Sequence, residues 1–317
     1  MASTAGGTAS RWALLLAVLT AALGVSLAWN LSDPANPDLS ALVRVIADCM
    51  AALVLGLAAL LRLQGPGSRR SIKALDLWRP IAAAAGVWVI AEVALLLFEA
   101  SSASGRTVAK VGTDALRTFV LETSNGQVGL AAVACALAVV GYASVAFRQR
   151  ADWSTDPVLA VAALALVLRP ITGHMSQQTL GPLLGAVHAL AAGLWFGLLV
   201  AMGLIVQSRG GWAELLPRFS NWALWCVVIL TGSGIVNAFV RLQGITPFFD
   251  SGYGRIVVAK TVVLAGLVGL GWYWRRTWVR EASGHRMTAA ASLQRAIVET
   301  MLMATAFGLA AALAGTA

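Results

Sequence analysis

Charged residues are scarce in this sequence of 317 residues. Asp, Glu, Lys and Arg make up only 12% of it, whereas an ordinary soluble domain contains about 25% charged residues. Because the hydrophobic fraction is 59%, this scarcity excludes a soluble enzyme and a disordered chain.

Cysteine is also rare. Cys49, Cys135 and Cys226 lie within apolar stretches and form no CxxC pair, which excludes a secreted disulfide scaffold and argues against a zinc site.

Several motifs of enzyme active sites are absent as well. The sequence contains no GxSxG and no HExxH, so nothing indicates a Ser–His–Asp hydrolase or a zinc peptidase. A glycine-rich loop that would hold nucleotide phosphates is also missing. We therefore predict that the chain is not an enzyme and does not drive transport with ATP.

Long apolar runs dominate the sequence, and a transmembrane helix needs about 20 apolar residues. Nine runs are separated by polar, Pro-bearing or Gly-bearing breaks, at residues 12–29, 39–61, 80–98, 127–147, 157–172, 180–206, 219–241, 254–274 and 293–314. Unpaired backbone groups are not tolerated in lipid, and no alternating barrel pattern is present. We therefore predict an all-α, polytopic transmembrane bundle of about nine helices. The first run also resembles a signal peptide with a cleavage site near Ser26-Leu27-Ala28, and its removal would leave eight spans.

Positive charges are unevenly distributed between the two sides of the predicted bundle. Of 23 Lys and Arg residues, 15 fall on the side of the N-terminus, 6 on the other side and 2 within spans. Lys and Arg gather in cytoplasmic loops, so we predict a cytoplasmic N-terminus and an extracytoplasmic C-terminus. The same bias accounts for most of the net charge of +9. We therefore predict the lipid bilayer, and no nucleic acid, as a partner of the chain.

The longest extracytoplasmic break, residues 101–124, has apolar residues at helical spacing. Val108, Val111, Ala115 and Phe119 recur every three or four residues, with charged residues between them. This pattern predicts a short helix on the membrane surface, and a plain ordered loop is the alternative.

Glycines occur at four-residue spacing in the sixth span. Gly181 and Gly185 form one such pair, and Gly193 and Gly197 form a second. Small residues at this spacing allow a neighbouring helix to approach closely, so we predict a tight helix contact at this span.

Polar residues within the predicted spans share one layer in the outer half of the membrane. They are Arg44, Asp48, Glu92, His188, Asn237 and Lys260. Such groups are unfavourable in lipid and are functional candidates by default. We expect Arg44 to pair with Asp48 four residues later, and Lys260 to pair with Glu92 or Asp48 across helices. The layer is either a structural ion-pair network or a water-filled vestibule that opens outward.

The inner half of the predicted bundle contains fewer such groups. Glu299 follows Arg295 by four residues in the last span. Opposite charges at this spacing lie on one face of a helix, so we expect a structural ion pair there.

An imidazole and a thioether stand side by side before the sixth span, at His174 and Met175. This pair suits copper, because soft thioether ligands select Cu(I) over harder ions. Within the span, His188 begins a stripe that continues at seven-residue intervals to Trp195 and Met202. His188 is either a copper ligand or a structural histidine that bonds to a neighbouring helix. Other soft groups in the spans, for which core packing is the simpler explanation, are Cys49, Met50 and Cys226.

Short motifs follow one another through the second half of the chain. They are His188-Ala-Leu-Ala-Ala-Gly-Leu-Trp195-Phe-Gly197, Arg218-Phe219-Ser220, Thr231-Gly232, Tyr253-Gly254-Arg255 with Lys260, and Glu299. In this order they resemble the copper resistance protein D family over residues 173–315, with Gly173-His174 at the start. The resemblance implies a multi-pass protein of the bacterial plasma (inner) membrane that moves copper inward. It also implies functional positions at His174, His188, Trp195, Lys260 and Glu299.

The resemblance divides the chain into residues 1–172, with the first five spans, and residues 173–317, with the preceding outer loop and the last four spans. It also implies a partner, namely an extracytoplasmic copper-binding chaperone or a cytochrome oxidase assembly factor. The domain division and the partner are expectations from the resemblance, since no spacing or composition in the sequence specifies either of them.

Three functions are compatible with these observations. In the first, His174 and Met175 capture Cu(I) and pass it to His188 and the bundle interior. The expected pathway or polar layer consists of Arg44, Asp48, Cys49, Met50, Glu92, Trp195, Met202, Asn237, Lys260 and Glu299. In the second, the chain does not transport and docks a copper chaperone or assembly factor. In the third, it binds haem for electron transfer, which requires two facing imidazoles.

Overall fold

The structure of the chain, a computed structural model, describes residues 13–32, 38–65, 72–172, 181–242 and 246–314. Every regular element within these residues is a helix, which confirms the all-α prediction. The long helices are α2 (Leu16–Leu31), α3 (Ser40–Ala59), α4 (Ala74–Ser104), α6 (Ser124–Gln149), α7 (Asp156–Thr172), α8 (Gly181–Ile205), α9 (Arg209–Leu242), α11 (Gly252–Arg276) and α13 (Ala289–Leu313). The short helices are η1 (Ala13–Leu15), η2 (Leu60–Leu63), η3 (Val108–Lys110), α5 (Thr113–Glu122), α10 (Pro247–Asp250) and α12 (Trp278–Ser283).

Each predicted apolar run coincides with one of the long helices. In the described part of the chain, seven helices are long and apolar enough to cross a membrane. The other two, α2 with 16 residues and α7 with 17, are shorter. The long apolar helices identify a multi-pass membrane protein, whereas the total of nine spans and the orientation stay predictions.

Two helices begin well before the apolar runs that predicted them. Helix α4 begins at Ala74 instead of residue 80, and α9 begins at Arg209 instead of residue 219. At the start of α4, the carboxylate of Asp76 accepts a hydrogen bond from the backbone N–H of Lys73 at 3.1 Å. This contact satisfies a backbone donor at the helix terminus and places a negative charge in the first turn. The charged side chains of Asp76 and Arg79 kept residues 74–79 out of the apolar run, although Leu77 and Trp78 in this stretch are buried.

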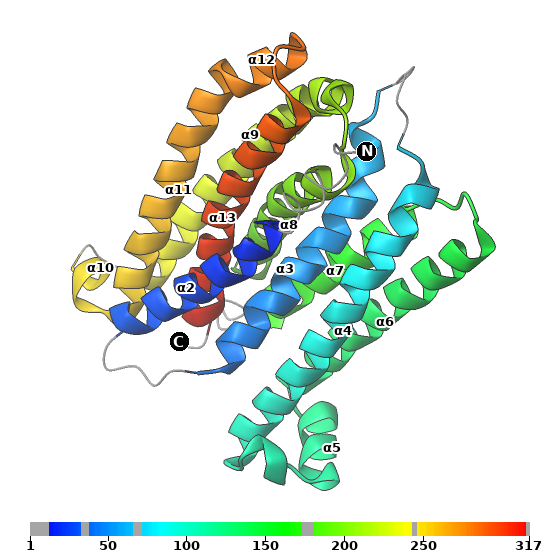
Figure 1. Cartoon of the computed structure of the whole chain (residues 1–317). Coiled ribbons are helices and arrows are strands. Elements are labelled where there is room, and N and C mark those ends of the chain that lie inside the picture. Colours follow the sequence, from blue (N-terminus) through cyan, green and yellow to red (C-terminus); the bar gives the residue numbers. More distant parts are fainter. Residues whose placement is uncertain (1–12, 33–37, 66–71, 173–180, 243–245, 315–317) are drawn as a thin grey trace.

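Helix α3 lies in the middle of the bundle and packs against α4, α7, α8 and α13 (Figure 1). Every residue from Ala51 to Ala59 on this helix is buried. Neighbouring backbones approach closely here, because a Cβ built on Gly56 would lie 1.9 Å from the carbonyl carbon of Gly197 on α8. The close helix approach predicted at the sixth span is therefore confirmed, and its partner is α3.

Helix α2 packs along α13, which joins the beginning of the described chain to its end (Figure 1). A Cβ on Gly24 of α2 would lie 2.3 Å from the carbonyl oxygen of Thr305 on α13. A Cβ on Gly308 of α13 would lie 2.0 Å from the carbonyl oxygen of Ala21. The two helices thus meet through glycine at a second close contact. Whether the first span is cleaved stays a prediction.

The predicted short helix in the outer loop is present as α5, beside the ends of α4 and α6 (Figure 1). Phe119 on α5 is buried and packs with Leu96 and Ala100 of α4 in a small apolar cluster of its own. Oγ1 of Thr123, between α5 and α6, accepts a hydrogen bond from the backbone N–H of Gly126 at 3.0 Å and caps α6. The location of α5 on a membrane surface stays a prediction.

Candidate functional site

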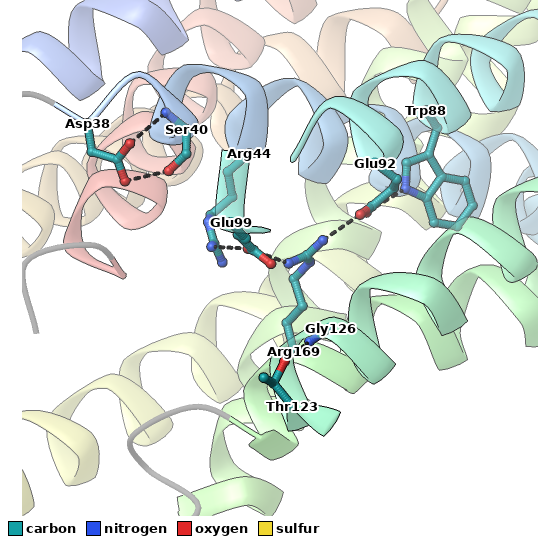
Figure 2. A network of polar contacts seen from close by, with 9 residues as sticks. All are labelled: Asp38, Ser40, Arg44, Trp88, Glu92, Glu99, Thr123, Gly126 and Arg169. Carbon is teal, nitrogen blue, oxygen red and sulfur yellow. Dashed lines mark hydrogen bonds and ion pairs between the residues drawn. The ribbon is translucent and has the colours of Figure 1, made fainter. Parts of the chain in front are cut away.

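A network of partly buried ion pairs joins α3, α4 and α7 (Figure 2). Nη2 of Arg44 on α3 donates to Oε1 of Glu99 on α4 at 2.8 Å, and Nη1 of Arg169 on α7 donates to the same oxygen at 3.2 Å. Nη2 of Arg169 also forms an ion pair with Oε2 of Glu92 on α4. The other oxygen of Glu92 accepts a hydrogen bond from the indole N–H of Trp88 at 3.1 Å. These contacts form one continuous polar network across three helices.

Helix geometry explains why α4 supplies both carboxylates. Glu92 and Glu99 lie seven residues apart, which is close to two full turns, so both side chains project from one face of α4. Arg169 bridges them with only 17% of its side chain exposed, and Glu92 is 5% exposed. Buried charges are stable only when they are paired and hydrogen-bonded, so this bridge holds α7 against α4.

Asp48 on α3 adds a third carboxyl group to the surroundings of this network. It interacts electrostatically with Arg169, Arg44 and Glu92. Within the described chain, Oε2 of Glu99 is buried without a hydrogen-bond partner. This part of the bundle therefore contains three carboxyl groups and two guanidinium groups, so that the acidic groups outnumber the basic ones by one.

The network corrects the ion pairs expected from the sequence. Arg44 pairs with Glu99 on another helix instead of with Asp48 on its own helix. Glu92 pairs with an arginine of α7 instead of with Lys260. For Lys260 itself, the described residues provide no ion-pair partner.

Among the ion-paired residues of this network, sequence reasoning missed Glu99 and Arg169. Glu99 follows the third apolar run directly, and Arg169 precedes Pro170 near the end of the fifth, so both resemble boundary residues. One signal was present in the sequence, namely the seven-residue interval between Glu92 and Glu99, which places two acids on one helix face. Two ionised acids on one helix face are stabilised by a cation from a neighbouring helix.

His188 belongs to a separate polar group formed by α8, α9 and α11. Nδ1 of its imidazole lies 2.8 Å from Oγ of Ser233 on α9, and a Cβ on Gly234 would lie 3.8 Å from Cε1 of the ring. Lys260 on α11 interacts electrostatically with His188. One turn beyond Ser233, Oδ1 of Asn237 is buried and has no hydrogen-bond partner among the described residues.

The single polar layer expected from the sequence is thus divided into two groups. Within the described ranges, no hydrogen bond or ion pair connects the group around His188 with the network of α3, α4 and α7. The similar depth of these residues was therefore insufficient to predict contact between them.

A third buried polar contact lies one heptad further along α8. The indole N–H of Trp195 donates to Oε1 of Glu299 on α13 at 3.2 Å, and Glu299 is only 6% exposed. Arg295 forms its ion pair with Glu281 at 3.6 Å, which corrects the pair expected between Arg295 and Glu299. Met202, the last residue of the heptad stripe, is fully buried in the apolar core.

The described residues contain no group of three or more His, Cys, Asp or Glu side chains that could hold a metal ion. The predicted capture pair, His174 and Met175, lies outside the described residues. On α3, Cys49 is a half-buried free thiol, and Met50 follows it. The described part of the chain thus offers separate single ligands, such as His188 and Cys49, in place of an enclosed metal site.

An apolar groove of about 350 Å³ lies between α8 and α9. It is lined by Val187, Leu190, Ala191, Leu194, Trp222, Trp225, Cys226 and Ile229. The lining offers a single soft ligand, the thiol of Cys226, and otherwise only hydrocarbon and indole surface. The groove therefore suits an apolar occupant better than an ion.

Two family models match the chain. One is described as copper resistance protein D and matches residues 213–313, and the other, described as copper resistance protein D-like, N-terminal domain, matches residues 35–181. The copper transport protein CutJ of Bacillus subtilis (strain 168) is 27% identical over an alignment of 173 positions, and the alignment covers 49% of this chain. The chain covers only 31% of the length of that relative. No solved structure matches the chain.

Proposed function

Because the chain belongs to the copper resistance protein D family, we propose that it carries copper inward across a bacterial plasma membrane. The copper ion, as Cu(I), is the transported substrate in this proposal. The printed name of the relative from Bacillus subtilis supports transport, and the long apolar helices supply the multi-pass scaffold. The inward-negative potential favours entry of a cation by about 2.3 kcal/mol per charge per 100 mV, so no ATP-hydrolysing domain is required.

The observation that carries this proposal is the position of His188. Its imidazole lies within α8, a helix apolar enough to cross a membrane, and it contacts α9 through Ser233. An ionisable group at such a position is a functional candidate, because it is unfavourable in lipid. Neutral imidazole is also a good copper ligand. His188 is therefore the proposed intramembrane contact for copper.

The proposed route begins at His174 and Met175, whose imidazole and thioether suit Cu(I). From there the ion passes to His188. The excess of carboxyl groups around Asp48 and Glu92 supports an attractive potential for a cation in the neighbouring part of the bundle. Copper crosses by moving between single ligands, in keeping with the lack of an enclosed metal site in the described ranges.

Replacing His188 by alanine is expected to reduce copper uptake to the level of vesicles without protein. The measurement is accumulation of Cu(I), kept reduced by ascorbate, in liposomes that contain the purified chain as their only protein. The control is His285→Asn, because His285 lies near the start of α13 with φ 54°, a backbone conformation that asparagine tolerates. Uptake by His188→Ala equal to that of the wild type would remove His188 from the proposal.

The same vesicles separate transport from docking of a copper chaperone. A transporter accumulates copper when it is the only protein present, whereas a docking protein does not. If wild-type vesicles accumulate no copper under an inward-negative potential, the transport proposal is wrong and the docking function takes its place.

A further inference from the structure

The hydroxyl of Ser233 makes two short contacts on α9 and α8. Its Oγ lies 2.6 Å from the carbonyl oxygen of Ile229, one turn earlier on α9. The same Oγ lies 2.8 Å from Nδ1 of His188 on α8. Ser233 is buried, with 5% of its surface exposed, so water does not compete freely for these contacts. The hydroxyl therefore links the backbone of one helix to the imidazole of another.

Counting protons determines the direction of both hydrogen bonds. A carbonyl oxygen has no proton, so an oxygen–oxygen contact of 2.6 Å between Ser233 and Ile229 requires the single hydroxyl proton of Ser233. With that proton used, Oγ can only accept a hydrogen bond from His188. Nδ1 of His188 must then carry a proton. In neutral imidazole, a proton on Nδ1 leaves the lone pair on Nε2.

We propose that Ser233 is a positioning residue that holds His188 in its Nδ1–H tautomer, so that Nε2 is the nitrogen that meets copper. The inference rests on the proposed role of His188 in transport. Metal-binding histidines commonly donate their second ring N–H to a fixed acceptor, which sets both the tautomer and the orientation of the ring. Here the acceptor is a serine hydroxyl whose own orientation is set by the α9 backbone.

The surroundings of the ring are consistent with this assignment. Gly234 brings the α9 backbone against the ring, since a Cβ there would lie 3.8 Å from Cε1. No described residue forms a hydrogen bond with Nε2, so the lone pair is available. The charged group on the adjacent helix, Lys260, interacts electrostatically with His188 and is a donor that cannot take the Nδ1 proton.

The tautomer can be measured directly, because the chain contains only three histidines. Solid-state NMR on the full chain labelled with ¹⁵N-histidine in lipid vesicles resolves protonated from unprotonated ring nitrogens, and His188→Gln identifies the signals of His188. In copper-free wild-type protein we expect a protonated Nδ1 and an unprotonated Nε2. Ser233→Ala is expected to lose this pattern and to lower Cu(I) uptake by about 10–100-fold. Ser233→Thr retains the hydroxyl, so this variant is expected to keep both the wild-type protonation pattern of the ring and the wild-type uptake of Cu(I).

The control is Ser104→Ala on α4, which removes another serine-to-carbonyl hydrogen bond, to Ser101 at 3.2 Å, and is expected to change neither readout. A wild-type signal with the proton on Nε2, or a pattern that is unchanged in Ser233→Ala, would overturn the inference even if uptake falls. An altered tautomer with full uptake would also overturn it. Absence of uptake in the wild type together with the expected tautomer would reject transport and leave the Ser233–His188 hydrogen bond established.

Discussion

Replacing Arg169 by glutamine is expected to lower the free energy of unfolding by about 3–5 kcal/mol. The guanidinium of Arg169 bridges Glu92 and Glu99, whose side chains are only 5% and 16% exposed. Glu99 retains its ion pair with Arg44 in this variant, but Glu92 retains only the hydrogen bond from Trp88. A buried carboxylate without a cation is far less stable than a paired one, which explains the size of the expected loss. Reversible unfolding with SDS in mixed micelles measures it.

The matched control is Arg62→Gln. Arg62 pairs with Asp156 at 2.6 Å, but both side chains are more than half exposed, at 53% and 59%. Because water solvates both charges of such an exposed pair when it is broken, the free energy of unfolding of this variant is expected to be close to that of the wild type. Glu92→Gln in the Arg169→Gln background should recover part of the stability, since it removes the unpaired charge. If Arg169→Gln and Arg62→Gln lower the free energy of unfolding by the same amount, the network does not have the stabilising role expected of it.

The positions of the long helices could be predicted because hydropathy depends on local composition alone. The sixth apolar run, 180–206, ends within one residue of the end of α8 at Ile205. The start of α9 could not be predicted in this way, because its polar first turns from Arg209 lie outside the apolar run. Helices in lipid are also apolar on every face, so hydropathy does not indicate which face meets which neighbour.

Because hydropathy does not indicate which helix faces meet, the contacts between helices in the candidate site could not be predicted. The pairing of Arg44 with Asp48 was expected because both lie on one helix, yet Arg44 extends to Glu99 on another. The hydrogen bond between His188 and Ser233 joins positions 45 residues apart, and no spacing rule within one helix connects them. His188 could be named as a candidate from its residue type in an apolar run alone, and its role in a site stays a prediction.

Small residues do indicate a helix face, because glycines at four-residue spacing in the sixth span predicted its close contact with a neighbouring helix. Replacing Gly197 by leucine is expected to prevent formation of the native bundle. A Cβ on Gly197 would lie 1.8 Å from the carbonyl oxygen of Ala52 on α3, and this backbone atom cannot move aside as a side chain can. Helices α3 and α8 would have to separate along a fully buried contact. Even Gly197→Ala is expected to lower the free energy of unfolding by about 1–3 kcal/mol, which is the usual effect of overpacking a core.

The yield of monodisperse protein on size-exclusion chromatography and the unfolding temperature in detergent measure this effect. The control is Gly141→Leu on α6, because a Cβ at Gly141 meets no atom within 4 Å and leucine there extends from an exposed position. We expect Gly141→Leu to behave as the wild type and Gly197→Leu to give little folded protein. Comparable yields and unfolding temperatures for both leucine variants would mean that α3 and α8 do not meet through Gly56 and Gly197.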